Sequence, residues 1–350
     1  MFDFEYTGNI HIHSDHSDGA KPIKVIAESA AHVGIDFICI NDHSYMKSSL
    51  DLHEEGFYGN VLVLVGLELG KRHHHYLAYG INELIRSDFG PQETIDLVNE
   101  QGGFGFMAHP FEKGMPFKEK SIAYSWEDRS VTGFSGLSIW NFMSRWKERV
   151  KTIFHGIFFL IFPIKTLKGP SRDTISFWDS LSMHRRVTAV GGSDAHGTDF
   201  RVGPIKFKPF SYEFLFNSIN IHVFLNSKIF RDFDTAKRDI LDAMKEGRLF
   251  ISHDNLQPAK GFKFYFISVD GSDLMMGEED LFRDGKIIIE LPASGEIRLF
   301  RNGILIKKWR GMREVVYTLE EKGVYRVEVH RRSIPFGWRP WIFTNPIYLR

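Results

Sequence analysis

The first two hundred residues alternate short apolar runs with segments of helical periodicity. Between Pro22 and Gly34, apolar residues recur every three or four positions, and proline suits the first helical turn as glycine suits the exit. Further helices are predicted over 91–101 and 173–186. Runs that fit strands are 9–13, 37–41, 61–69, 76–79, 104–108, 136–140 and 187–191. Strands alternating with helices predict an α/β fold with a mostly parallel sheet, open or closed into a barrel.

The pattern changes after residue 234. A helix is predicted over 235–245, and strand follows strand from residue 260 onward. These strands are expected over 262–269, 286–290, 296–300, 304–309, 314–318 and 323–330. Asn302-Gly303 is a strong hairpin signal between two of them. Because Pro258 and Gly261 break the pattern, we expect an α/β domain over 1–257 and an antiparallel β domain over 258–350.

The longest apolar stretch, residues 153–164, is about half as long as a membrane-spanning helix. No membrane span is therefore predicted. We expect a buried segment; the alternative is an interfacial helix flanked by Lys151, Lys165 and Lys168.

Charge and cysteine content exclude some classes of protein. Lys+Arg and Asp+Glu balance at 44 each, so tight nucleic-acid binding is not expected. The last fifty residues carry eleven Lys/Arg against four Asp/Glu, which fits a solvated face or a weak surface for anionic ligands. Cys39 is the single cysteine, which excludes an intramolecular disulfide, and its apolar neighbours predict burial. The acidic N-terminus lacks a signal-peptide pattern, so a cytoplasmic location is expected.

Histidines and carboxylates gather at the ends of the predicted strands. His11 and His13 lie two apart in a strand, so alternation places both side chains on one face, where two imidazoles can begin a metal site. Other candidates follow apolar strands directly: Asp42-His43, Glu68, His109, Asp194 and His196. One polar residue at a strand end is usually a solvated loop residue. Several with metal-ligand chemistry indicate a metal site, since strand ends of a barrel converge on one face.

These segments resemble, in order, the motifs of the polymerase-and-histidinol-phosphatase (PHP) superfamily. The segments are His11-Ile12-His13-Ser14 with Ser17-Asp18-Gly19, Asn41-Asp42-His43, Gly66-Leu67-Glu68, Ala108-His109-Pro110 and Ser193-Asp194-Ala195-His196. The resemblance covers residues 9 to about 200. It implies a distorted (β/α)7 TIM-like barrel, two or three divalent metal ions (Zn, Fe or Mn) and, in most members, hydrolysis of phosphoesters.

The resemblance also implies a set of metal ligands. One ion would take His11, His13, Glu68 and Asp194; a second would share Glu68 and add His75 and His109; a third would take Asp18, His43 and His196. His73 or His74 could replace His75, which we prefer because it directly precedes the strand over 76–79. His16 could compete with Asp18.

The C-terminal segments 246–250, 301–303 and 345–348 look like those of a PHP branch with a β-sandwich-like domain after the barrel. Some of that branch act on carbamate esters. The expected function is a metal-dependent phosphoesterase acting on a small-molecule phosphomonoester or phosphodiester. Alternatives are a carboxylic or carbamate ester hydrolase on the same metals, and a non-catalytic metal-binding module.

The expected mechanism is attack by a hydroxide that bridges metals held by the catalytic residues Glu68 and Asp194. Arg201 is a candidate phosphate clamp or an exposed surface arginine, and Ser14 either orients the substrate or bonds within its turn. Histidines without a supporting motif are expected to be structural: His155, His184, His222, His253 and His330.

Overall fold

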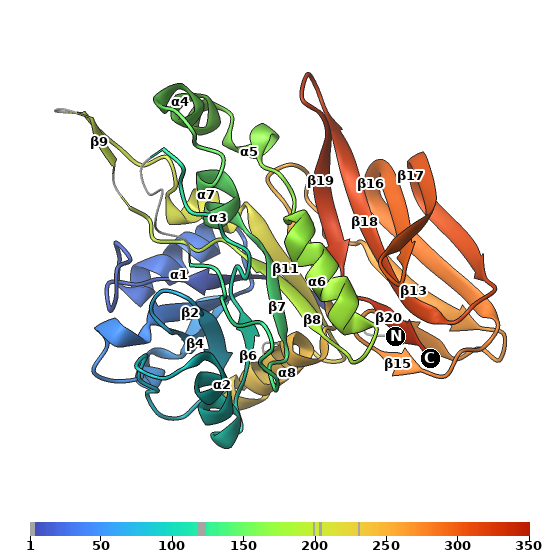
Figure 1. The fold of residues 1–350 in the computed structure, drawn as a ribbon, viewed down its shortest axis with the longest axis horizontal. Coiled ribbons are helices and arrows are strands. Elements are labelled where there is room, and N and C mark those ends of the chain that lie inside the picture. Colours follow the sequence, from blue (N-terminus) through green and yellow to red (C-terminus); the bar gives the residue numbers. More distant parts are fainter. Residues whose placement is uncertain (1–3, 118–123, 199, 203–204, 230–231) are drawn as a thin grey trace.

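The sheet of the N-terminal part carries the candidate site. The structure is a computed structural model that describes residues 4–117, 124–198, 200–202, 205–229 and 232–350 (Figure 1). Neighbouring strands are β1 (Phe4–Ile12), β2 (Phe37–His43), β4 (Val61–Leu69), β5 (Tyr76–Tyr79), β6 (Phe104–Met107), β7 (Gly136–Asn141) and β8 (Thr188–Gly192). All run parallel to their neighbours except β5, which is antiparallel to β4 and β6. A parallel bridge between Ile12 and Ala195 connects the two ends of this series.

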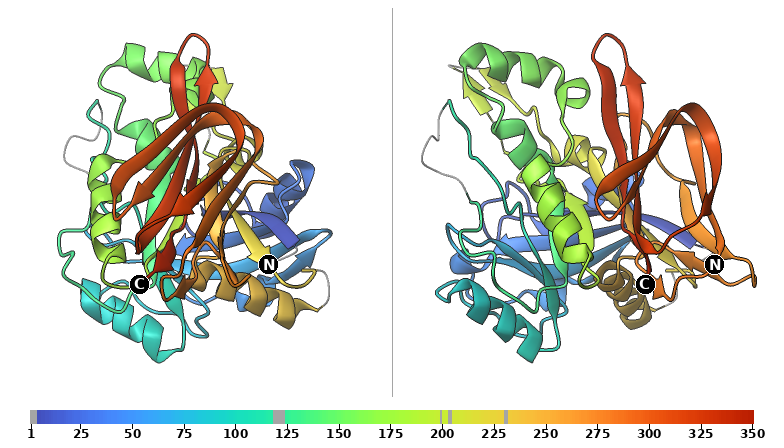
Figure 2. Two further views of the ribbon diagram at one scale, coloured as in Figure 1. Left: turned by 90° about the vertical axis from the view of Figure 1, so that its right-hand side faces the viewer. Right: turned by 45° about the vertical axis from the view of Figure 1, so that its right-hand side comes forward.

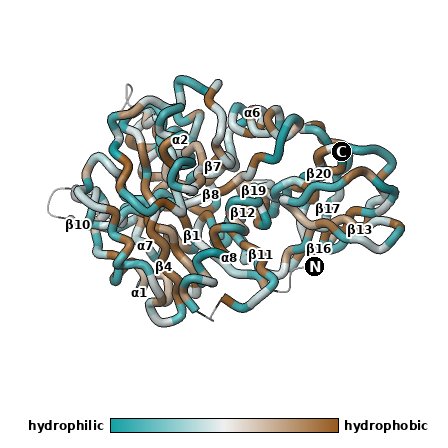
Figure 3. Tube along the Cα trace, turned by 90° about the horizontal axis from the view of Figure 1, so that it is seen from below, coloured by the Kyte–Doolittle hydropathy of each residue, from teal (hydrophilic) through white to brown (hydrophobic). Residues whose placement is uncertain are grey.

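These strands are buried because other parts of the protein cover both faces of their sheet. Every residue of β4 is buried, and the hydropathy trace is brown along this strand (Figure 3). Such a continuous apolar run is typical of a strand in a covered, largely parallel sheet. The α/β class is confirmed, whereas the sevenfold barrel count stays a prediction.

The predicted helices are confirmed with small shifts at their ends. They are α1 (Ile23–His32), α2 (Pro91–Glu100), α6 (Arg172–Ser182) and α8 (Phe233–Glu246), whereas the short helices α3 (Phe142–Lys147) and α7 (Tyr212–Phe216) were not predicted. α1 buries Ile23, Ile26, Ala27 and Ala30, the apolar positions of its helical pattern. α8 ends at Gly247, whose φ of 77° gives the left-handed C-cap that glycine adopts readily.

Two strands that the pattern did not predict extend the sheet beyond β1. β11 (Ile219–Leu225) pairs antiparallel with β1, and β12 (Leu249–His253) pairs antiparallel with β11. β12 also pairs with a C-terminal strand, β19 (Gly337–Thr344), so hydrogen bonds run from one part of the chain into the other. The short strands β3 (Gly56–Tyr58), β9 (Phe200–Val202) and β10 (Ile205–Phe207) lie outside this series.

The C-terminal β region is confirmed, but several of its strands are longer than predicted. They are β13 (Lys263–Ser268), β14 (Asp273–Met275), β15 (Glu279–Asp280), β16 (Gly285–Arg301), β17 (Ile304–Leu319), β18 (Gly323–Ser333), β19 and β20 (Ile347–Leu349). The separate strands predicted over 286–290 and 296–300 are one strand, β16, whose register shifts after Glu290 let it bend. β17 likewise joins two predicted strands. Asn302 and Gly303 have φ of 51° and 76°, as the expected two-residue hairpin requires.

One pairing corrects the expectation of an entirely antiparallel region: β15 runs parallel to β20. The C-terminal strands enclose a second apolar core around Phe264, Ile287 and Val327. Buried Arg326 joins this region to α6, since its guanidinium donates to both oxygens of Asp179 at 2.7 and 2.8 Å. The boundary at 257/258 stays a prediction.

The segment expected to be buried, residues 153–164, is instead exposed. It forms α4 (Ile153–Ile161) and the start of α5 (Pro163–Thr166), and Phe159 is the buried residue of α4. The helices project at the same end of the molecule as the β18–β19 hairpin (Figure 2). No helix of the described residues is long and apolar enough to cross a membrane.

Candidate metal centre

The backbone is strained where the candidate ligands lie. His11, His109 and Asp194 have φ of 63°, 30° and 56°, a region that side-chain-bearing residues rarely adopt. His11 lies in β1, whereas His109 and Asp194 closely follow β6 and β8. Such residues persist only where the surroundings hold them, and they concentrate at functional sites.

The strain corrects one step of the sequence reasoning. The register of β1 against β2 shifts between Asn9 and Ile12, so simple alternation does not explain why His11 and His13 face one site. Their rings nevertheless lie 5.3 Å apart. The left-handed His11 is held by its neighbours: its N–H donates to Asn41 Oδ1 at 3.1 Å, and its carbonyl accepts from the Ala195 N–H at 3.1 Å.

Glu68, at the end of β4, is the centre of the arrangement. Histidine nitrogens surround its buried carboxylate: His75 Nδ1 at 2.7 Å, His11 Nε2 and His43 Nδ1 at 3.1 Å, and His13 Nε2 and His109 Nε2 at 3.4 Å. Burial raises the pKa of Glu68, but His75, His11 and His43 outweigh it and hold the pKa well below its usual range. The carboxylate is therefore ionised at neutral pH.

A second set of contacts surrounds Asp18 and Asp194. Asp18 oxygens lie 3.3 Å from His196 Nε2, 3.5 Å from His13 Nδ1 and 3.6 Å from His43 Nε2. Asp194 Oδ1 lies 3.3 Å from His13 Nε2 and 3.4 Å from His11 Nε2. Burial raises the pKa of both carboxyls, but the histidines outweigh it and lower both pKa values. The same contacts raise the pKa of His196 to about 9, against the effect of its burial.

Among the described residues, ligand atoms gather closely enough to hold an ion in overlapping groups. These are His13, Asp18, His43 and His196; His11, Glu68 and His109; and His11, His13 and Asp194. The structure thus brings the predicted residues together, with His75 beside Glu68 but outside these groups.

Unsatisfied polar atoms test whether the residues fit a metal. His11 Nε2, both His13 ring nitrogens, His43 Nδ1 and Glu68 Oε1 are buried and, within the described part of the chain, make no well-aligned hydrogen bond, although each faces an oppositely charged group of the cluster. Leaving such an atom unsatisfied costs about 1–3 kcal/mol. Divalent ions would satisfy them, and imidazole and carboxylate ligands without thiolate suit Zn, Fe and Mn alike.

The open choices among histidines become clearer. His73 Nδ1 lies 3.1 Å from Glu127 at the surface, and the His74 ring lies 3.1 Å from the Phe89 carbonyl. Of the triplet, His75 is the residue whose ring contacts Glu68. His16 pairs with Glu54 rather than with the cluster, and Asp18 takes the place inside it.

The predicted substrate-binding residues are less informative. The Ser14 N–H and hydroxyl donate to the Asp42 carboxylate at 2.7 and 2.6 Å, which holds the turn that leads to Asp18. Arg201 lies in β9, and its side chain falls outside the described part of the structure. The substrate-binding roles of both residues, and the catalytic role of Arg201, stay predictions.

Two supporting residues were missed. Asn141 Nδ2 donates to Asp194 Oδ2 at 3.3 Å, and its position directly after the predicted strand 136–140 could have revealed it. Glu112 Oε2 lies 3.2 Å from His109 Nδ1, on the far side of that ring from Glu68. Its spacing of three residues from His109 was the available signal.

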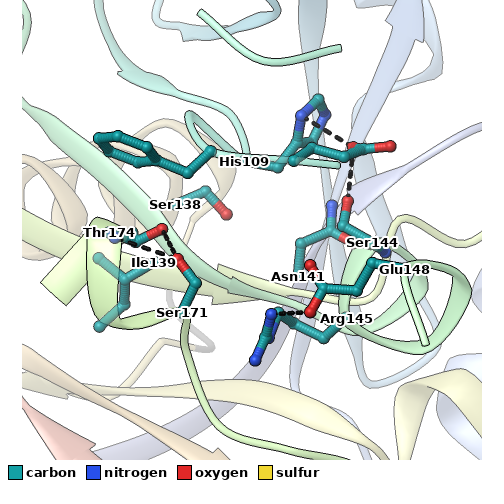
Figure 4. Close-up of a pocket in the computed structure, with 11 residues that line it drawn as sticks. His109, Ser138, Ile139, Asn141, Ser144, Arg145, Glu148, Ser171 and Thr174 are labelled. Atoms are coloured by element: carbon teal, nitrogen blue, oxygen red, sulfur yellow. Dashed lines mark hydrogen bonds and ion pairs between the residues drawn. The ribbon is translucent and has the colours of Figure 1, made fainter. Parts of the chain in front are cut away.

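A small polar cavity adjoins His109 on the side of these supporting residues. Its volume is about 20 Å³, and Asn141, Ser138 and Ser144 contribute to its lining (Figure 4). A cavity of this size holds about one water molecule. It therefore belongs to the support of the site, not to a substrate pocket.

Parts of the chain are similar to known proteins. Residues 9–131 match the family model described as the PHP domain. An uncharacterized protein of Methanocaldococcus jannaschii is 25% identical over 114 residues, which cover 29% of this chain and 67% of that protein. A Bacteroides vulgatus structure described as a two-domain protein containing a predicted PHP-like metal-dependent phosphoesterase is similar at a TM-score of 0.48. It has 13% identity, and the alignment covers 98% of this chain and 96% of that one.

Proposed function

We propose that the chain is a metal-dependent hydrolase of phosphomonoesters or phosphodiesters, and the match of residues 9–131 to the PHP-domain family model supports this proposal. The observation that carries the proposal is the set of buried imidazole nitrogens that converge on ionised Glu68 without well-aligned hydrogen bonds. A site maintained for structure alone would satisfy these atoms within the protein.

The proposed ligands divide among the ions as the family resemblance implies. One ion is assigned to His11, His13, Glu68 and Asp194, another to Glu68, His75 and His109, and a third to Asp18, His43 and His196. Divalent ions held there would lower the pKa of water toward neutrality and stabilise negative charge on a phosphoryl oxygen.

The charge balance favours an anionic substrate. The site carboxylates are Asp18, Glu68 and Asp194, and their lowered pKa values keep all of them ionised. Two divalent ions would therefore leave a net charge of about plus one, and three about plus three, with the imidazoles neutral. Such a site attracts a phosphoester more strongly than an uncharged ester.

The remaining residues orient the ligands. Asn141 holds one oxygen of Asp194 so that the other faces His11 and His13. Glu112 contacts His109 Nδ1 and so leaves Nε2 toward Glu68. Such outer contacts fix the tautomer and ring orientation of a metal-binding histidine.

The test measures bound metal by mass spectrometry in protein purified without added metal. Rates on an aryl phosphomonoester, an aryl phosphodiester and an aryl carboxylic ester are measured on the same preparation. We expect two or more ions per chain and phosphoester turnover that Glu68→Gln abolishes. Glu296→Gln is the matched control, because it replaces a buried carboxylate that pairs with Arg298 and Arg310 in the β region.

Two other outcomes would each contradict one part of the proposal, either the substrate class or the metal site. Turnover of the carboxylic ester alone would assign the protein to the ester hydrolases and leave the ligand assignment standing. Fewer than one ion per chain, unrecoverable on reconstitution, would refute the metal site.

A further inference from the structure

Helix α4 turns an apolar face toward solvent. Ile153, Phe154, Ile157, Phe158, Ile161 and Phe162 are all exposed, with Phe154 exposed by 79% and Ile161 by 63%. Their spacing of one, three and four residues places them along one face of the helix. A surface helix normally presents its polar face to water, so this apolar face requires an explanation.

The β18–β19 hairpin extends the same surface. The Phe336 ring lies 5.6 Å from that of Phe162 and 6.4 Å from that of Phe158. Ile334, also in this hairpin, is 77% exposed. Both views of Figure 2 show α4 and the hairpin projecting at the same end of the molecule. We call the exposed apolar residues of α4 together with Ile334 and Phe336 the apolar tip.

Basic residues outnumber acidic ones beside the apolar tip, where Glu148 is paired with Arg145. Residues 149–171 contain Arg149, Lys151, Lys165 and Lys168, residues 329–340 contain Arg331, Arg332 and Arg339, and neither segment contains Asp or Glu. Burial and the nearby cations Arg339 and Arg145 together lower the pKa of Arg149 to about 10, although Glu148 acts in the opposite direction. An anion bound here would relieve this repulsion between like charges.

A groove lies between α5 and the hairpin at the edge of the apolar tip. Its volume is about 410 Å³, and its lining combines apolar Ile161 and Phe162 with basic Lys165, Arg331 and Arg332. This combination fits a group that is anionic at one end and apolar at the other. A lipid phosphate with the start of its acyl chain has that chemistry.

We propose that the apolar tip and its basic rim dock the protein onto an anionic lipid bilayer, with α4 lying in the interface. Apolar side chains beside Lys and Arg are the chemistry that the surface of such a bilayer recognises. A second copy of this chain fits less well, since a twofold contact would bring the same cations against each other.

The experiment is co-sedimentation of the whole chain with vesicles of phosphatidylcholine alone or mixed with phosphatidylglycerol. We expect binding to the mixed vesicles, weakened by added salt, and little binding to phosphatidylcholine. Phe154→Ser with Ile161→Ser should lower the partition coefficient at least about tenfold. Lys165→Gln with Arg332→Gln should lower it about thirtyfold.

Matched controls separate the tip from general surface effects. Val269→Ser with Leu281→Ser removes apolar residues exposed by 80% and 70% elsewhere, and Lys286→Gln with Lys322→Gln removes exposed cations of the β region. Both controls should bind as the wild type does, and Phe154→Leu should retain binding. Turnover at the metal centre without vesicles should be unchanged in every variant.

Several results would overturn the proposal. Binding to neither vesicle, or equal loss in the tip and control variants, would remove the role of the tip. Concentration-dependent self-association that Phe154→Ser abolishes, without vesicle binding, would assign the surface to a second copy of the chain.

Discussion

Glu112 offers a direct test of how the candidate site is held. Its carboxylate is buried, lies 3.2 Å from His109 Nδ1 and is anchored by the Ser144 hydroxyl at 2.7 Å and Lys147 Nζ at 2.5 Å. Burial raises its pKa, but His109 and Lys147 outweigh it and keep the pKa below its usual value, so the group is ionised. Glu112→Gln removes this charge and nearly preserves the shape.

The geometry sets the size of the effect. Two unit charges 3.2 Å apart interact by about 5 kcal/mol at an effective dielectric constant of about 20. A neutral imidazole polarised by a metal carries only a fraction of a unit charge. If that fraction is about a quarter to a half, its interaction with Glu112 is worth about 1.3–2.5 kcal/mol. We therefore expect metal affinity to fall about 10- to 70-fold, within the range typical of changes to a residue that contacts a metal-binding histidine.

Competition with a chromogenic chelator measures this affinity for zinc in the wild type, Glu112→Gln and the control Glu296→Gln. The control should bind zinc as the wild type does. The reasoning fails if Glu112→Gln binds zinc within twofold of the wild type, or if Glu296→Gln loses as much affinity. Either result would mean that the contact with His109 does not reach the metal.

The remaining predictions concern stability. Burial lowers the pKa of His222, but carboxylates, including Asp254 at 3.1 Å, outweigh it and raise the pKa to about 9. The contribution of His222 to the free energy of unfolding is therefore full below pH 6.5 and is lost as pH rises through 9. The difference in unfolding free energy between wild type and His222→Asn should shrink by about 3 kcal/mol over that range in urea titrations; a constant difference would contradict this. Chelator should lower the melting temperature of the metal-loaded wild type more than that of Glu68→Gln, which lacks the ligand shared by two of the proposed ions, and equal shifts would count against the site. Arg326→Ala should lower the unfolding free energy by about 3–5 kcal/mol by leaving Asp179 unpaired, and a loss below about 1 kcal/mol would show that the pair is replaceable.

The candidate site could be predicted from the sequence because its residues lie at strand ends. Glu68 lies at the end of the apolar strand β4, and His109 follows the apolar strand β6. The topology of the sheet brings the C-terminal ends of such strands together. The reason for the pairing of His11 with His13 could not be predicted. Simple alternation gives the correct face for the wrong reason. In the structure, His11 adopts a left-handed conformation inside β1, and hydrogen bonds with Asn41 and Ala195, far along the chain, hold it there.

The remaining errors share a physical cause, because the hydrophobic pattern of a segment does not reveal which other parts of the protein pack against it. The apolar run 153–164 has the same periodicity whether its partner is the protein core or another surface, so its exposure was not predictable. β11 contains Asn220 and His222, which look like breaks in an apolar strand but are satisfied by Asp254 inside the protein. Within β16, two separate strands were predicted over 286–290 and 296–300, but the structure joins them through a shift in register.

The positions of backbone strain and unsatisfied polar atoms, which both lower the stability of the fold, point to the functional site. Left-handed residues, each costing on the order of 1–3 kcal/mol, occur at His11, His109 and Asp194, and unpartnered buried nitrogens occur at His13 and His43 beside them. At these side chains the two penalties coincide, whereas elsewhere in the described residues, as at His253 and Tyr76, a buried polar atom lacks a hydrogen bond without backbone strain. Selection for stability alone would remove such a concentration of strain. Ions that bind the folded chain would offset both penalties at once, because they need the nitrogens free and the ligands held in these orientations.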